Sequence, residues 1–122
     1  MFLLVLRQID HLWYRTLASE SSSASYDHSL WTPHVVVINI GQNDFNMRNN
    51  PVSEELPARM KVFIAEVQDA YGSSGGVFVL CSTMWAADVH CPIMETMVAE
   101  MAQSTVQFVD MRLPGVDLEG CK

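Results

Sequence analysis

The chain has 122 residues, a length that corresponds to one domain. Hydrophobic residues make up 49% of it and charged residues 17%, so we expect a packed core and not a disordered tail. Seven basic and fourteen acidic residues give a net charge of −7, which argues against nucleic acid or an anionic membrane as the main partner. No apolar run approaches the roughly 20 residues that a membrane span requires.

The N-terminal part is predicted to be a helix followed by a polar connector. Apolar residues recur at helical spacing from Phe2 to Leu17, which predicts an amphipathic helix of the folded domain. Arg7 interrupts the apolar start and the features of a signal peptide are missing, so the compartment stays open. The serine-rich stretch 19–32 then predicts a solvated connector.

Three short apolar runs predict strands. Val35–Ile40 is almost entirely β-branched, and its continuous apolarity indicates a strand covered on both faces, as in a parallel sheet. Val77–Cys81 has the same character, and Thr105–Asp110 is a shorter, more mixed run. The sequence therefore predicts three strands separated by long connections.

Two further helices are expected between these strands. Apolar residues at helical spacing from Leu56 to Tyr71 predict the first, and Pro92 is expected to open the second, whose apolar face runs to Met101. Helices and strands therefore alternate along the chain. This order predicts an α/β domain with a parallel sheet and right-handed crossovers.

Ligands of open α/β sheets bind beyond the carboxyl ends of the strands, where residues 41–51, residues 82–91 and the tail after residue 110 would lie. The first of these segments begins Gly41-Gln42-Asn43-Asp44. Glycine permits a sharp turn with an accessible N–H, and an asparagine amide can donate to a developing oxyanion. An aspartate can accept backbone N–H bonds and hold the loop. An ordinary turn is the alternative interpretation.

The segment from Pro33 to Phe45 resembles the Gly-x-Asn-Asp block of the SGNH (GDSL-type) hydrolases, which follows a parallel strand. Leu30-Trp31-Thr32-Pro33 before it and the ending Gly115–Cys121 are similar to the carbohydrate-esterase branch, which deacetylates xylan and related glycans. The resemblance implies a flavodoxin-like three-layer α/β/α fold. Residues 1–122 would form a single incomplete domain of it, with about three strands and three helices.

The resemblance also implies roles for four residues. Asn43 would donate to the oxyanion, Gly41 would belong to the oxyanion loop, and Asp44 would hold that loop. Trp85, in the second strand-end segment, would face an acyl or sugar group, with local packing as the alternative. The implied ligand is an acetylated carbohydrate or another small ester, and no cofactor is expected.

Two parts of the family's catalytic machinery have no match in this sequence. There is no Gly-Asp-Ser nucleophile block, and Gly120 stands three residues after Asp117, where the family has its catalytic His. We therefore expect a fragment of a serine esterase that acts through an acyl-enzyme and is inactive alone. Two alternatives stay open: a non-catalytic flavodoxin-like binding or interaction module, and half of a site that another chain completes.

The remaining histidines are not expected to replace the missing base. His90 follows Asp88 in the predicted 82–91 loop and is expected to be a solvated loop histidine. Asp27-His28-Ser29 contains three triad residue types, but neighbours in sequence rarely have triad geometry.

The cysteines predict no metal site. Cys81, Cys91 and Cys121 are too few and too widely spaced for a zinc site of the paired-CxxC kind. Cys81 is expected to pack in the core. A disulfide between Cys91 and Cys121 stays open for an oxidising compartment.

An incomplete sheet would leave a strand edge unpaired, and such an edge favours association between chains. We therefore predict that the isolated chain is marginally stable or self-associates. Sedimentation velocity and thermal melting check this prediction, and a sharp cooperative melt of a monomer would contradict it.

Overall fold

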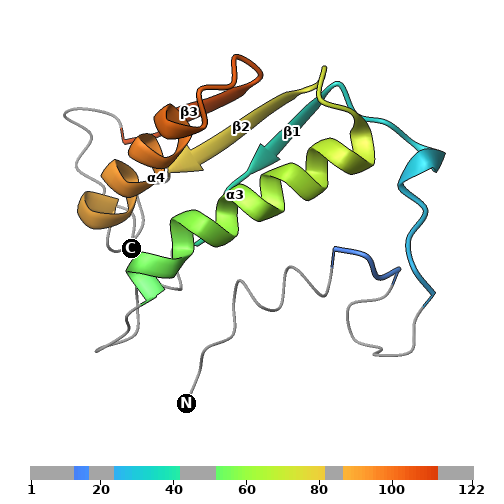
Figure 1. Cartoon of the computed structure of the whole chain (residues 1–122), viewed down its shortest axis with the longest axis horizontal. Helices are drawn as coiled ribbons and strands as arrows, with labels where there is room; N and C mark the ends of the chain where they lie inside the picture. The colour runs from blue at the N-terminus through green and yellow to red at the C-terminus, as the bar shows by residue number, and fades with distance from the viewer. Residues whose placement is uncertain (1–12, 17–23, 42–51, 82–86, 113–122) are drawn as a thin grey trace, which may run out of the picture.

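The computed structural model describes residues 13–16, 24–41, 52–81 and 87–112. The elements in order are the 3-10 helix η1 (His28–Leu30), β1 (Val35–Ile38), α3 (Val52–Tyr71), β2 (Gly76–Cys81), α4 (Ala87–Met101) and β3 (Val106–Asp110). The strands form one parallel sheet in the order β1-β2-β3, and α3 and α4 are the crossovers (Figure 1). The predicted α/β class with a parallel sheet is therefore confirmed.

The core lies between one face of the sheet and the two helices. Along β2, side chains alternate between buried and half-buried, with Val77, Val79 and Cys81 on the buried face. Helices α3 and α4 cover that face side by side and contact each other (Figure 1). The buried apolar cluster draws on every strand and both helices: Ile38, Leu56, Met60, Phe63, Ile64, Val67, Val77, Val79, Met94, Met97, Val98 and Val106.

The opposite face of the sheet is open among the described residues. Val35 is 50% exposed and Val37 58% exposed, whereas the next residue, Ile38, is 4% exposed. The prediction that this strand is covered on both faces is therefore wrong for the described part of the chain. Two right-handed crossovers that advance in the same direction place both helices on the same side of a sheet. Self-association through an unpaired strand edge stays a prediction.

Helix α3 begins close to its predicted N-terminus at Ser53, whereas α4 begins earlier than the sequence predicted. α3 begins at Val52 and contains Pro57, and α4 begins at Ala87, five residues before the Pro92 that was expected to open it. Asp88 in the first turn suits the positive end of the α4 dipole. Neither of the described helices is long and apolar enough to span a bilayer.

The described N-terminal residues form a turn and not a helical end. Residues 13–16 make a turn and an antiparallel bridge between Arg15 and Ser25, so the helix predicted to reach Leu17 is wrong at this point. Trp13 stacks on His28 with ring centroids 4.6 Å apart, and His28 Nδ1 lies 2.9 Å from the Tyr71 hydroxyl. These contacts fix both N-terminal stretches against the end of α3.

The register of β1 gives a direct test of this arrangement. We expect Ile38→Ala to lower the free energy of unfolding by about 2–4 kcal/mol, because it removes a buried side chain from the core. Val37→Ala should change it by less than about 0.5 kcal/mol, since that side chain faces outward. Urea denaturation of the two variants measures both values. Equal losses would contradict the observed register, because a slip by one residue exchanges the two faces.

Candidate functional site

The carboxyl ends of the three strands meet at one edge of the sheet. Gly41 follows β1, Cys81 ends β2 and Asp110 ends β3, and the parallel pairing brings these positions to the same side of the molecule (Figure 1). This is the edge at which α/β sheets bind ligands. Of the predicted site residues, Gly41 is described, and Asn43, Asp44 and Trp85 lie outside the described residues.

Gly41 is buried and has a positive φ of 100°. A β-carbon at this position would stand 3.1 Å from Nε2 of His90 and 3.4 Å from both terminal carbons of Leu56. The backbone angle therefore favours glycine at the turn after β1, and a β-carbon there would also require the His90 ring to shift slightly. The sequence indicated the turn but not its contact with α4.

His90 is the buried neighbour of that turn. It lies in the first turn of α4 and is fully buried, so the prediction of a solvated loop histidine is wrong. Burial lowers the pKa of the His90 imidazole, and a hydrogen bond with the backbone of Ile40 opposes that shift by favouring the protonated ring. The net direction is downward, which favours the neutral ring.

The sequence contained a pattern that predicts the burial of His90. Met94, Met97 and Val98 form the buried face of α4, and one turn further back the same face contains His90 and Cys91. Reading Pro92 as the first helical residue hid this extension. Pro92 is instead the sixth residue of α4, where it leaves the carbonyl of Asp88 without the usual backbone donor. The segment predicted as a loop over residues 82–91 is thus helical from Ala87 onward.

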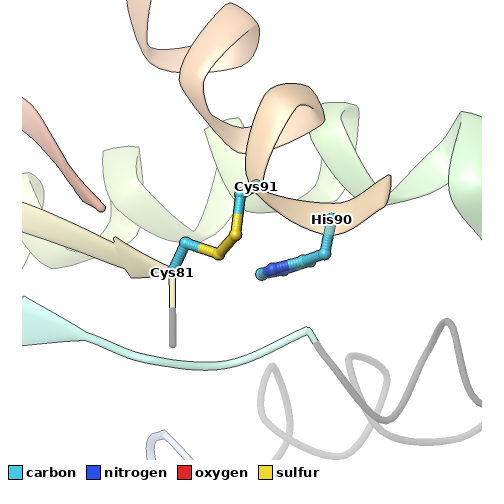
Figure 2. Close-up of side chains that lie close together, drawn as sticks. All are labelled: Cys81, His90 and Cys91. Carbon is cyan, nitrogen blue, oxygen red and sulfur yellow. A yellow bond between two sulfur atoms is a disulfide. The ribbon is translucent and has the colours of Figure 1, made fainter. Parts of the chain in front are cut away.

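A disulfide joins Cys81, at the end of β2, to Cys91 in α4, with the Cα atoms 5.4 Å apart (Figure 2). Cys81 is buried as predicted, but its sulfur is bonded. The alternative pairing of Cys91 with Cys121 is therefore contradicted. The bond closes a loop of ten residues, and loop closure of that length contributes about 2–3 kcal/mol through the unfolded state.

An ion-pair cluster holds the chain as it leaves β3. Arg112 donates from Nε to Asp110 Oδ1 at 2.9 Å and from Nη2 to Oδ2 at 2.6 Å, and its Nη1 lies 3.5 Å from Asp88 Oδ1. These hydrogen bonds lower the pKa of Asp110 from 3.8 to about 2. Their contribution is therefore present above pH 3.8 and is lost as the pH falls through about 2. Asp88 is fully exposed, and the side chains of Arg112 and Asp110 are 35% and 37% exposed, so solvent screening keeps the effect on stability small.

The Asp27-His28-Ser29 segment lies away from this edge and has no triad geometry. Asp27 Oδ1 accepts from the Ser29 backbone N–H at 2.9 Å and from the Ser29 hydroxyl at 2.6 Å, which caps η1. His28 instead bonds the Tyr71 hydroxyl, at the end of α3. These residues act in local packing.

Three solved structures resemble the chain. A family two carbohydrate esterase from Clostridium thermocellum in complex with cellohexaose matches with a TM-score of 0.76 and 26% identity over 91% of this chain. An active-site mutant of such an esterase from the same organism matches with a TM-score of 0.75 and 26% identity over 91% of this chain.

A carbohydrate esterase whose active site displays divergent catalytic and non-catalytic binding functions matches with a TM-score of 0.69 over 84% of this chain. At 18% identity this last likeness concerns the fold alone. The chain spans 34% of the two Clostridium thermocellum chains and 35% of the third chain. No protein-family model and no curated protein matches the sequence. The fold is thus carbohydrate-esterase-like.

Two glycine variants separate the backbone strain at Gly41 from its packing. Gly72 also has a positive φ, 86°, but nothing lies within 4 Å of a β-carbon built there. We expect Gly72→Ala to cost about 1–2 kcal/mol of unfolding free energy from the backbone angle alone. Gly41→Ala should cost a further 1–3 kcal/mol or so, because His90 and Leu56 must move.

Urea denaturation measures both variants, and a His90→Ala background provides the control. In the His90→Ala background, Gly41→Ala should lower the unfolding free energy by less than it does in the wild type, because the ring nearest the new methyl group is gone. Equal costs for the two glycine variants in the wild-type background would contradict the close contact between Gly41 and His90.

Proposed function

We propose that the chain forms the oxyanion-hole portion of an SGNH-type carbohydrate esterase. The observation that carries the proposal is the buried, positive-φ Gly41 at the carboxyl end of β1, within a carbohydrate-esterase-like fold. It is the first residue of Gly41-Gln42-Asn43-Asp44, the segment that resembles the family's Gly-x-Asn-Asp block. The sequence motif and the strand-end turn therefore support the same role.

In this role the chain stabilises charge and does not attack the ester. The N–H of the Gly41 turn and the side-chain amide of Asn43 would donate to the oxygen that becomes negative when a serine adds to the acetyl carbonyl. Asp44 would hold the loop by accepting backbone N–H bonds, and Trp85 would face the acyl or sugar group. The contact between Gly41 and His90 would fix the turn in advance of the reaction.

The nucleophile and the base would come from chain outside residues 1–122. The sequence has no Gly-Asp-Ser block and no Asp-x-x-His block, so we propose that these 122 residues alone do not turn over an ester. His90 does not replace the base, because its buried ring lies against Gly41 and the disulfide and not in an open site. The missing groups would be supplied by the same gene product or by a partner chain.

The proposed substrate is an acetyl ester on a carbohydrate. Its support is the resemblance of the sequence to the glycan-deacetylating branch and the likeness to esterases from Clostridium thermocellum, one of them complexed with cellohexaose. The acidic chain also suits an uncharged glycan better than a polyanion.

A non-catalytic carbohydrate-binding module is the second candidate. The likeness to a carbohydrate esterase solved in complex with cellohexaose supports it. The two candidates differ in one respect: an esterase portion gains turnover when the missing blocks are supplied, whereas a binding module does not.

The test is complementation followed by mutation of the proposed donor. The chain is co-expressed with a segment that supplies the Gly-Asp-Ser and Asp-x-x-His blocks, and hydrolysis of an acetylated xylo-oligosaccharide is measured. We expect turnover from the mixture, and Asn43→Ala should lower it by about 10²–10³-fold with little change in melting temperature, because one oxyanion donor is lost.

Asn39→Ala is the matched control, since it removes the same side chain at an exposed position just before the turn and should leave turnover unchanged. Equal turnover with and without the Asn43 amide would remove that residue from the oxyanion role. A mixture that binds the saccharide but never hydrolyses it would favour the binding module.

A further inference from the structure

Three potential metal ligands meet at the carboxyl end of β2. Cys81, His90 and Cys91 are each fully buried, and their ligand atoms all lie within 4.8 Å of one another. Cys81 ends the strand, and the other two are consecutive residues of α4 (Figure 2). The imidazole of His90 lies beside the two sulfur atoms (Figure 2).

We propose that, when the Cys81–Cys91 disulfide is reduced, the two cysteines and His90 bind Zn²⁺. The site would thus alternate between a disulfide and a three-ligand zinc centre. This inference does not depend on the esterase proposal, because it concerns side chains to which that proposal gives no chemical step.

The spacing suits tetrahedral zinc. Zinc–sulfur bonds of about 2.3 Å place two thiolates of one tetrahedron about 3.8 Å apart, and a ring nitrogen stands slightly closer to each sulfur. Ligand atoms within 4.8 Å of one another can reach that geometry by side-chain rotation. The Cα atoms of the cysteines, 5.4 Å apart, need not move far.

The charge balance suits the burial. Two thiolates and one Zn²⁺ sum to zero, and His90 binds as a neutral ring. A buried site with no net charge avoids the large desolvation cost of an isolated ion. Three carboxylates and one Zn²⁺ at the same depth would instead carry a net charge of about −1.

The surroundings of His90 also suit a ligand. A histidine that binds a metal usually orients its ring by donating the other N–H to a carboxylate or a backbone carbonyl. The His90 ring forms a hydrogen bond with the backbone of Ile40. Gly41 leaves room for the ring, because any β-carbon there would approach Nε2 to 3.1 Å.

Zinc binding requires prior reduction of the Cys81–Cys91 disulfide. A reduced dithiol transfers two electrons and two protons to the Cys81–Cys91 bond, giving two thiols, and is itself oxidised to a disulfide. Zn²⁺ then displaces the two thiol protons to solvent and binds both sulfurs and one ring nitrogen. Water occupies the fourth position, as is usual where three protein groups bind zinc.

The test uses the full chain with Cys121→Ser, so that only the two proposed thiols remain. The chain is reduced with a phosphine, which avoids the competition for metal that a dithiol would cause, and is titrated with Zn²⁺ and with Co²⁺ as a spectroscopic probe. We expect one equivalent of metal and a thiolate-to-cobalt charge-transfer band in the reduced chain, and neither in the oxidised chain.

His90→Gln should weaken zinc affinity by about 10–100-fold or more, and Cys91→Ser should abolish the thiolate signature of a two-sulfur site. His34→Gln is the control, because that histidine is exposed before β1 and should have no effect. Uptake that is unchanged in both His90→Gln and Cys91→Ser, or no uptake by the reduced chain, would overturn the proposal.

The proposal can also be tested if the reduced chain unfolds. If the reduced chain loses its helical circular dichroism, Zn²⁺ should restore it in the Cys121→Ser chain but not in the Cys91→Ser chain. Failure of zinc to restore the helical signal would identify the cysteines as a structural disulfide only.

Discussion

The parallel pairing of β2 with both neighbouring strands is the constraint on which the rest of the structure depends. It aligns β1, β2 and β3 in one direction, so that Gly41, Cys81 and Asp110 reach the same edge from distant parts of the sequence. It also fixes which residues of each strand face the helices. Without this pairing the turn after β1 would have no defined partner, and the candidate site would not exist.

Helix α4 provides the second link by joining that edge to the core. Its buried face continues from the methionines of the core to His90 and Cys91 at the edge of the sheet. His90 lies against Gly41, and Cys91 is bonded to Cys81. His90 therefore lies between the candidate oxyanion turn and the two sulfurs. The proposed zinc site and the proposed ester site are neighbours in space.

Much of the fold could be predicted from local sequence signals, whereas the contacts of the site could not. The β-branched run at β1 and the apolar stripe of α3 are properties of short segments, and both elements were confirmed. The burial of His90 depends on where α4 begins, and Pro92 was a misleading local signal because it stands inside the helix. The Cys81–Cys91 bond depends on the strand end meeting α4, which no local pattern encodes. The exposed face at Val37 follows from the handedness of both crossovers, not from the composition of the strand.

We propose that the segment Gly41–Asp44 stabilises the oxyanion of a carbohydrate esterase. The most direct measurement is to sequence the native transcript beyond residues 1 and 122 and to examine the complete product by mass spectrometry after brief exposure to an acetylated xylo-oligosaccharide. We predict that the transcript encodes a Gly-Asp-Ser block and an Asp-x-x-His block, and that an acetyl group is trapped on that serine. A transcript with neither block, whose product forms no acyl-enzyme either alone or together with the chains that co-purify with it, would contradict the esterase role and favour the binding module.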